Sequence, residues 1–296
     1  MRAPGCRRKE GGMMALDTAP TRPALRYHGG KFRLAPWILT FLPRHAVYVE
    51  PFGGGGSVLL AKPQAPTEVY NDLDSRVVSL FRVLRDPAKA DEVARRLELT
   101  PFAREEYEGW CYAEPADDID AAHQLVARSF MGQSSKGIWQ RSGLDTRINP
   151  DGYCSRVSAL RASPDACRSI ARRLARVVIE HDNALNVIRR HDRPDAVIYC
   201  DPPYLTTEER GTRIYTHDFK EEDHRALADA LGSLKSAMVV LSGYPSALYN
   251  ELYPDWQRHQ RKAMADGGRE RTEVVWLNPA CAAALEQQAV QQRMFA

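Results

Sequence analysis

Patterns for binding metal and for spanning a membrane are both missing from this sequence. The six cysteines among its 296 residues are scattered, with no C-x-x-C pair and no histidine at the spacing of a zinc site. No apolar run reaches the roughly 18 residues that a membrane span needs. The basic residues near the N-terminus precede no apolar signal segment. We therefore expect a cytoplasmic protein with reduced thiols that binds neither a metal nor a membrane.

Charge is unevenly distributed, although the net charge is only +3 and the composition is that of an ordinary globular protein. Residues 84–120 hold eleven Asp and Glu against five Lys and Arg, whereas residues 121–176 hold ten Lys and Arg against three Asp and Glu. A basic block of this kind is typical of a surface that contacts a polyanion. Composition alone equally allows two solvated helix faces.

Short apolar runs alternate with helical stretches over most of the chain. Residues 1–22 show no periodicity and are predicted to be a disordered tail, with Met13 and Met14 as alternative starts. A helix is expected to begin at Ser57 as its N-cap, and another at 221–231. The predicted strands are 47–50, 68–71, 177–180, 196–200 and 238–241, with an antiparallel strand at 272–277. This alternation predicts an α/β fold with a doubly wound, mostly parallel sheet.

Strand signals vanish between residues 74 and 176, where the pattern becomes helical. Helices are predicted at 75–85 and 121–130, with a further start at Thr100-Pro101 and a turn at 149–152 inside a loop-like stretch. This module separates two acids that end strands, Asp72 and Asp201, and so interrupts the sheet. The predicted domains are a helical insertion at 83–176 within a sheet domain formed by 23–82 and 177–296.

Asp201-Pro202-Pro203-Tyr204 follows directly behind an apolar run and suits a flat ring that carries an amine. The Asp201 carboxylate and the Pro202 carbonyl can both accept hydrogen bonds from one exocyclic NH2 group, while Pro203 stiffens the turn. Tyr204 offers a π face on which the ring can stack. A tight turn with a capping acid is the simpler alternative.

A glycine turn at 53–56 suits a nucleoside. Glycine allows close backbone approach, and the sequence lacks the G-K-[ST] ending of a phosphate-binding loop. Asp72, at the end of the next strand, stands where a carboxylate accepts ribose hydroxyls, although an N-cap of the helix at 75–85 is its alternative role. Upstream, two glycines let Tyr27 and Lys31 point into one pocket, where Lys31 suits a carboxylate. A core tyrosine and a surface lysine would show the same pattern.

Five motifs occur in the order Y-H-G-G-K (27–31), E-P-F-G-G-G-G-S (50–57), N-D-L-D (71–74), D-P-P-Y (201–204) and T-E-V-V-W-L-N-P (272–279). In this order the chain resembles the DNA adenine-N6 methyltransferases, above all the solitary bacterial and phage enzymes that mark GATC-like sites. The resemblance implies a Rossmann-like methyltransferase fold whose helical insertion is the target-recognition domain. It further implies S-adenosyl-L-methionine as cofactor, double-stranded DNA as partner, no metal, and a flipped-out adenine as methyl acceptor.

The resemblance also assigns roles to particular residues. Asp201, Pro202 and Tyr204 would be catalytic, because they would hold the amine and the ring of the target adenine. The cofactor contacts would be Tyr27, Lys31, Phe52, Gly53, Gly55, Asp72, Asp201 and, near the cofactor's adenine, Asp182 or Asn183. At this last contact the family has an acid where this chain aligns Asn183, and Asp182 lies one residue early.

The basic half of the insertion is predicted to contact DNA. Candidates for phosphate contacts are Lys136, Arg141, Arg147 and Arg156, and candidates for base edges are Gln133, Ser134 and Ser135. A second basic cluster, predicted to be a loop on the DNA side, comprises Arg258, Arg261, Lys262, Arg269 and Arg271. Tyr215 and Phe219 are candidates for the base pocket or for core packing.

The same pocket chemistry would serve a methyltransferase that acts on cytosine N4, on RNA or on a protein amide. Asp201 favours adenine, because Ser is commoner there in cytosine enzymes and Asn in the RNA and protein enzymes. A non-catalytic DNA-binding relative would need a damaged site, whereas Asp-Pro-Pro-Tyr is intact. A monomer suffices for a reaction on one adenine. Solitary, phage-protective and restriction-modification roles all stay open, as does the recognition sequence.

Overall fold

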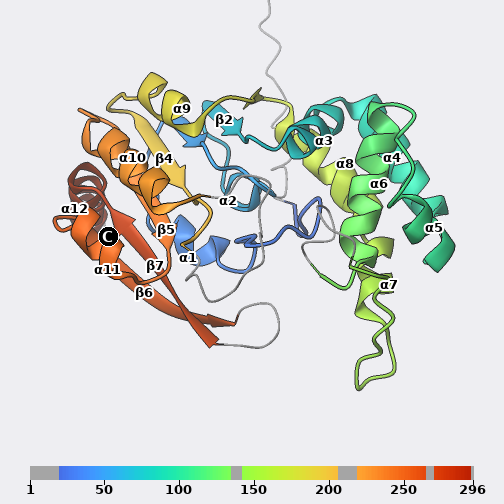
Figure 1. Ribbon diagram of the computed structural model, residues 1–296. Coiled ribbons are helices and arrows are strands. Elements are labelled where there is room, and N and C mark those ends of the chain that lie inside the picture. The colour runs from blue at the N-terminus through green and yellow to red at the C-terminus, as the bar shows by residue number, and fades with distance from the viewer. Residues whose placement is uncertain (1–19, 135–141, 206–218, 265–269, 295–296) are drawn as a thin grey trace, which may run out of the picture.

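The computed structural model describes residues 20–134, 142–205, 219–264 and 270–294. Within these ranges seven strands form one sheet in the order β3-β2-β1-β4-β5-β7-β6 (Figure 1). The strands are β1 (Val47–Glu50), β2 (Thr67–Asn71), β3 (Val177–Glu180), β4 (Ala196–Cys200), β5 (Met238–Gly243), β6 (Gln257–Met264) and β7 (Glu270–Leu277). Strands β1 to β5 are parallel, β7 is antiparallel to β5, and β6 is antiparallel to β7. The predicted fold class is confirmed.

Alternation along the strands divides the apolar side chains between the two faces of the sheet. Successive side chains of a strand point to opposite faces, so Tyr48 and Val49 belong to different buried clusters. The Tyr48 face is covered by α1 (Ala35–Leu39), α2 (Ser57–Ala61) and α12 (Pro279–Met294). The Val49 face is covered by α9 (Ala184–Arg190), α10 (Glu221–Gly232) and α11 (Ala247–Leu252). The sheet is therefore covered by helices on both faces.

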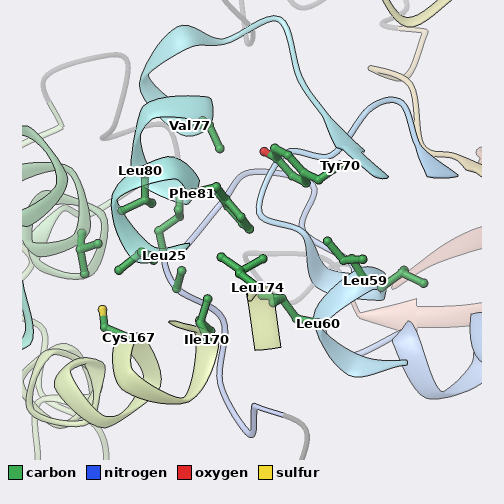
Figure 2. Packing of buried hydrophobic residues seen from close by; sticks show 14 of the residues in the cluster. Leu25, Leu59, Leu60, Tyr70, Val77, Leu80, Phe81, Cys167, Ile170 and Leu174 are labelled. Atoms are coloured by element: carbon green, nitrogen blue, oxygen red, sulfur yellow. The ribbon is translucent and has the colours of Figure 1, made fainter. Parts of the chain in front are cut away.

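Among the described residues between β2 and β3, where the sequence predicts the insertion, there are six helices. They are α3 (Ser75–Arg85), α4 (Pro87–Leu99), α5 (Arg104–Gly109), α6 (Asp118–Met131), α7 (Ser155–Arg161) and α8 (Ser163–Leu174). Helices α4 to α8 lie on the opposite side of the molecule from β6 and β7 (Figure 1). Leu80 and Phe81 of α3 and Ile170 and Leu174 of α8 join this module to the core (Figure 2). The predicted domain boundaries stay a prediction.

A buried ionic cluster ties the last helix of the insertion to the sheet. Arg173, near the end of α8, donates to Glu68 Oε1 of β2 at 2.9 Å and to the Leu59 carbonyl at 2.7 Å. Lys62 Nζ donates to the same carboxylate oxygen at 2.7 Å. All three charged side chains are at most 6% exposed. The cluster therefore joins α8, β2 and the end of α2 within the core.

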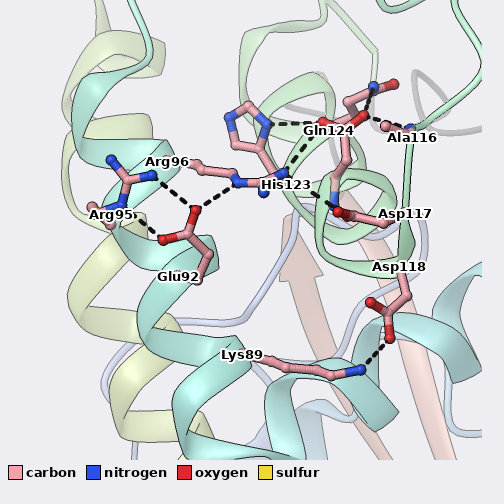
Figure 3. Close-up of polar contacts among 10 residues, drawn as sticks. Lys89, Glu92, Arg95, Arg96, Ala116, Asp117, Asp118, His123 and Gln124 are labelled. Carbon is pink, nitrogen blue, oxygen red and sulfur yellow. Dashed lines mark hydrogen bonds and ion pairs between the residues drawn. The ribbon is translucent and has the colours of Figure 1, made fainter.

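Polar contacts on the surface of the insertion join α4 to α6 (Figure 3). Lys89 of α4 pairs with Asp118 of α6, and Arg96 of α4 lies 3.7 Å from the Asp120 carboxylate. Exposed ion pairs of this kind contribute little individually. The buried 2.7 Å hydrogen bond between Thr100 Oγ1 and His123 Nε2 is shielded from water and so contributes more to the relative placement of the two helices.

One predicted helix start and one predicted N-cap are wrong, although α2 does begin at Ser57 as predicted. Thr100 closes α4 as its C-cap, with its N–H bonded to the Leu97 carbonyl, and the next helix begins only at Arg104. Pro101 explains the break, because a proline just after the C-cap cannot continue a helix. Gly56 rather than Ser57 is the N-cap of α2, since its φ of 62° is accessible mainly to glycine.

The sequence predicts neither a membrane span nor a metal site, and it predicts a disordered N-terminal tail. In the ranges given above, no helix is long and apolar enough to cross a membrane. The same residues contain no group of three or more His, Cys, Asp or Glu side chains that could hold a metal ion. Residues 1–19 of the predicted disordered tail lie outside the described residues.

Candidate active site

The strand order reverses at β1, which lies between β2 and β4. In an open parallel sheet, such a switch point leaves a crevice at the carboxyl ends of the strands, where ligands bind. A cleft of about 2170 Å³ opens there, and its lining includes Tyr27, Gly54, Asp72, Asp201 and Tyr204. The topology thus brings together motifs that are more than 170 residues apart in the sequence.

The end of β2 holds the glycine turn in place. Gly53 N–H donates to the Asn71 carbonyl at 2.8 Å, and the Tyr70 hydroxyl donates to the Gly54 carbonyl at 2.7 Å. Gly54 has a φ of 47°, and a Cβ there would lie 2.7 Å from the Tyr27 ring. No larger residue fits at Gly54 without displacing Tyr27, so the turn and the tyrosine form one wall of the cleft.

Asp72 completes this half of the cleft. Its Oδ2 accepts from Gly54 N–H and its Oδ1 from Asp74 N–H, both at 2.7 Å. Burial raises the pKa of the Asp72 carboxyl, while these two N–H donors act in the opposite direction. The alternative role of Asp72 as an N-cap is wrong, because Asp74 caps α3 by accepting from Arg76 N–H at 3.0 Å. Asp72 instead shapes the glycine turn and faces the cleft.

The other half of the cleft is centred on Asp201, directly after β4. Asp201 Oδ1 accepts from Ser242 Oγ at 2.7 Å and lies 3.1 Å from Lys31 Nζ. The buried Lys31 ammonium also stands 4.5 Å from the centre of the Tyr204 ring. Pro202 is buried beside them. Lys31 therefore contacts the two side chains assigned to the methyl acceptor, in addition to facing the cleft that would hold a cofactor.

The remaining predicted cofactor contacts are placed differently. Phe52 lines the cleft and packs edge-on against Phe219, with ring centres 5.7 Å apart. Asp182 accepts from Arg190 at 2.8 Å, and the Asn183 side chain caps α9 by accepting from Leu185 N–H at 2.9 Å. Neither Asp182 nor Asn183 belongs to the lining of the cleft, and a cofactor contact by either stays a prediction.

Two of the basic residues predicted to contact DNA share one buried acid. Arg147 donates to both oxygens of Asp145, and Arg156 donates to Oδ2 at 3.0 Å. The Arg147 and Arg156 guanidinium groups hold the pKa of the Asp145 carboxyl well below its usual range. Two cations against one anion still leave this point of the insertion positive, and Arg156 lines the cleft.

The predicted base-reading segment is only partly described. Gln133 follows α6, and its side-chain amide donates to the Leu144 carbonyl at 3.3 Å. Ser134 N–H donates to Ser142 Oγ at 3.4 Å, which keeps this end of the segment close to residue 142. The remaining predicted contacts Ser135, Lys136 and Arg141 lie outside the described residues, as do Arg269 and Tyr215.

The second basic cluster was predicted as a loop, and that prediction is wrong. Arg258, Arg261 and Lys262 lie on β6, the edge strand of the sheet, and Arg271 lies on β7. Lys262 pairs with Glu270 across the two strands at 2.7 Å. The sequence hid this strand because most of its side chains are exposed on both faces, so it shows no alternation of apolar and polar residues.

Sequence reasoning missed two side chains of the site. Ser242, at the end of β5, binds Asp201, and Glu273 on β7 accepts from the Tyr204 hydroxyl at 3.1 Å. Glu273 belongs to the motif T-E-V-V-W-L-N-P, and Ser242 directly follows the predicted strand 238–241. The missing signal was spatial, because only the order β4-β5-β7 brings them next to the turn at 201–204.

Fold and site together define a Rossmann-like methyltransferase. The D12 class N6 adenine-specific DNA methyltransferases match residues 27–133 and 146–266, and the chain belongs to this family. The predicted family and the predicted enzyme class, an adenine-specific DNA methyltransferase, are thereby confirmed.

Curated proteins of this kind resemble the chain over most of its length. The Type II methyltransferase M1.LlaDCHI of Lactococcus lactis subsp. cremoris is 27% identical, covering 87% of this chain and 95% of that protein. The DNA adenine methylase of Escherichia coli (strain K12) is 25% identical, covering 86% and 92%. The DNA N-6-adenine-methyltransferase of Escherichia phage P1 is 26% identical over 84% of this chain but only 34% of its own length. Two of these relatives come from bacteria and one from a phage.

Proposed function

We propose that this enzyme transfers a methyl group from S-adenosyl-L-methionine to the N6 amine of an adenine flipped out of double-stranded DNA. The observation that supports this proposal most strongly is the position of Asp201. Its carboxylate and the Tyr204 ring both lie close to Lys31 Nζ, and they share the cleft at the switch point with Asp72 and the glycine turn. A nucleoside cofactor and a second flat ring can therefore meet there end to end.

The half of the cleft that is formed by the glycine turn and Asp72 fits S-adenosyl-L-methionine. The carboxylate at the end of β2 offers acceptors for ribose hydroxyls, and the glycine turn carries no lysine for a phosphate. Tyr27, Phe52, Gly53, Gly55 and Asp72 would enclose the nucleoside and the amino-acid part. When bound, the cofactor supplies an electrophilic methyl group, and no metal is needed for its transfer.

The half of the cleft that is centred on Asp201 accounts for activation of the adenine amine. The lone pair of an adenine amine is delocalised into the ring, so acceptors that draw its hydrogens out of the ring plane make it a better nucleophile. Among the described side chains, Lys31 and Ser242 both reach Oδ1 of Asp201, and we assign Oδ2 and the Pro202 carbonyl to the amine. These acceptors also stabilise the positive charge that develops on nitrogen, while Tyr204 positions the ring.

DNA would approach the cleft between the insertion and the β6–β7 hairpin. Arg156 stands on one side of the opening, and Arg261, Lys262 and Arg271 stand on the other. Cations on both sides of a cleft can pair with the phosphates that flank a flipped nucleotide. Gln133 and Ser134 would then contribute to base recognition from the insertion.

The base that accepts the methyl group tests this proposal directly. Purified enzyme is incubated with radiolabelled S-adenosyl-L-methionine and one of three duplexes: unmethylated mixed-sequence, fully N6-adenine-methylated of the same sequence, and adenine-free. We expect label in the first duplex alone, recovered as N6-methyladenine after digestion to nucleosides. Equal labelling of the methylated or the adenine-free duplex would show another acceptor and contradict the proposal.

Substitution of Asp72 tests the cofactor half. Asp72→Ala removes a charged acceptor, whose hydrogen bonds contribute about 1.5–3 kcal/mol. We expect the affinity for S-adenosyl-L-methionine, measured by calorimetry, to fall about 10- to 100-fold. Asp86→Ala is the matched control, because Asp86 likewise accepts two backbone N–H bonds, at the start of α4. If both variants bind the cofactor like the wild type, Asp72 serves only the turn.

A further inference from the structure

Glu273 is an acid in a position where the fold gives no reason for one. It lies on β7 with only 8% of its surface exposed, and its neighbours Val274, Val275 and Trp276 are core residues. Burying a carboxylate costs free energy unless it finds a partner, and burial raises the pKa of Glu273. Its hydrogen-bond partner is the Tyr204 hydroxyl, which donates to Oε2 at 3.1 Å.

Tyr204 is held from several sides. Tyr244 packs edge-on against it, with ring centres 4.4 Å apart, and Arg271 fixes Tyr244 by donating to its hydroxyl at 2.8 Å. Arg271 and Glu273 are two residues apart on β7 and therefore point to the same face of the strand. One strand thus supplies the partner of Tyr204 and the partner of Tyr244.

The charges around Glu273 come from three segments. Lys31 and Arg271 favour its ionised form, whereas Asp201 opposes it. The Tyr204 phenol keeps its proton, because burial and the charges of Asp201 and Glu273 raise its pKa well above the ordinary value. The phenol is therefore a persistent donor to Glu273, and this hydrogen bond is stronger when Glu273 is ionised, the form that Lys31 and Arg271 favour.

We infer that Glu273 is a positioning residue for methyl transfer, which it serves by orienting the Tyr204 ring and increasing the electron density of the ring face. This inference rests on the proposed function, in which the target adenine stacks on Tyr204. An electron-rich face opposes a positive charge favourably, and such a charge develops on the adenine amine only during the transfer. Glu273 should therefore affect the transition state more than the binding of either substrate.

The test compares Glu273→Gln, Tyr204→Phe and the double variant in steady-state methylation of duplex DNA. Each single substitution should lower kcat about 10-fold and change both KM values by less than about 2-fold, as for an interaction made in the transition state. The double variant should lose no more than the more impaired single variant, because each substitution removes the same charge-assisted hydrogen bond, Glu273→Gln by removing the charge and Tyr204→Phe by removing the donor. Independent effects would multiply to about 100-fold.

Controls separate this inference from the proposed function and from misfolding. Glu251→Gln removes an exposed acid on α11 and should leave kcat unchanged. Wild-type enzyme that labels no adenine would overturn the proposed function, whereas active wild type with an unchanged Glu273→Gln variant would overturn the role of Glu273 alone. The role of Glu273 would also be overturned if the losses of kcat in the two single variants multiplied in the double variant. If Glu273→Gln fails to fold, an unchanged kcat for Tyr204→Phe overturns the inference, and a 10-fold loss supports it.

Discussion

We expect replacement of Asp201 with alanine to lower the rate of methyl transfer by about 10²- to 10³-fold, the usual loss for one group aimed at a developing charge. Alanine leaves the amine without the acceptor that we assign to it. It also leaves the Lys31 ammonium, which is 5% exposed, without the carboxylate that lies 3.1 Å away. The loss should appear in single-turnover rates, while Asp195→Ala, at the opposite end of β4, should react like the wild type.

A second variant excludes the trivial explanation that the unpaired Lys31 charge disrupts the site. In Asp201→Ala/Lys31→Met the buried charge is removed together with its partner, which often restores stability. We expect the melting temperature of this double variant to return toward the wild-type value while the rate stays low. A rate that recovers with stability would show that Asp201 serves only as a counter-ion and would contradict its assignment to the amine.

The central strands could be predicted because they are buried on both faces. Val47 to Glu50 and Ala196 to Cys200 are all buried, so each appears as a short apolar run whatever the helices around it. β6 gave no such signal, since an edge strand with exposed Arg258 and Arg261 meets solvent where a central strand meets a neighbour. β6 forms because it pairs with β7, and the local sequence pattern does not show this tertiary contact.

The composition of the site was predictable, but its connections were not. Asp72 and Asp201 could be predicted as hydrogen-bond acceptors for a ligand, because each acid ends a strand and faces a crevice. The sequence could not show that Lys31 lies against Asp201, or that the Tyr204 hydroxyl meets Glu273, because those contacts join segments 170 and 69 residues apart. The charge count likewise could not reveal that Arg147 and Arg156 share Asp145.

Substitution of Glu68 is expected to have the largest effect on stability. Glu68 is the one carboxylate of a buried cluster with Lys62 and Arg173. Burial alone would raise its pKa, but the hydrogen bonds from Arg173 and Lys62 bring that pKa below the usual value. Glu68→Leu would leave two cations unpaired in the core, and breaking a buried pair in this way costs about 3–5 kcal/mol.

The loss is a large part of a typical free energy of unfolding of about 5–15 kcal/mol, so urea denaturation should detect it easily. Arg173→Met should cost less, because Lys62 still neutralises Glu68. The exposed Arg176→Met is the control on the same connection and should be neutral. The triple variant Lys62→Met/Glu68→Leu/Arg173→Met removes all three charges of the cluster. It should recover much of the stability that Glu68→Leu loses. If the triple variant is as unstable as Glu68→Leu, the cluster stabilises the junction of α8 and β2 by its shape and hydrogen bonds rather than by balancing charge.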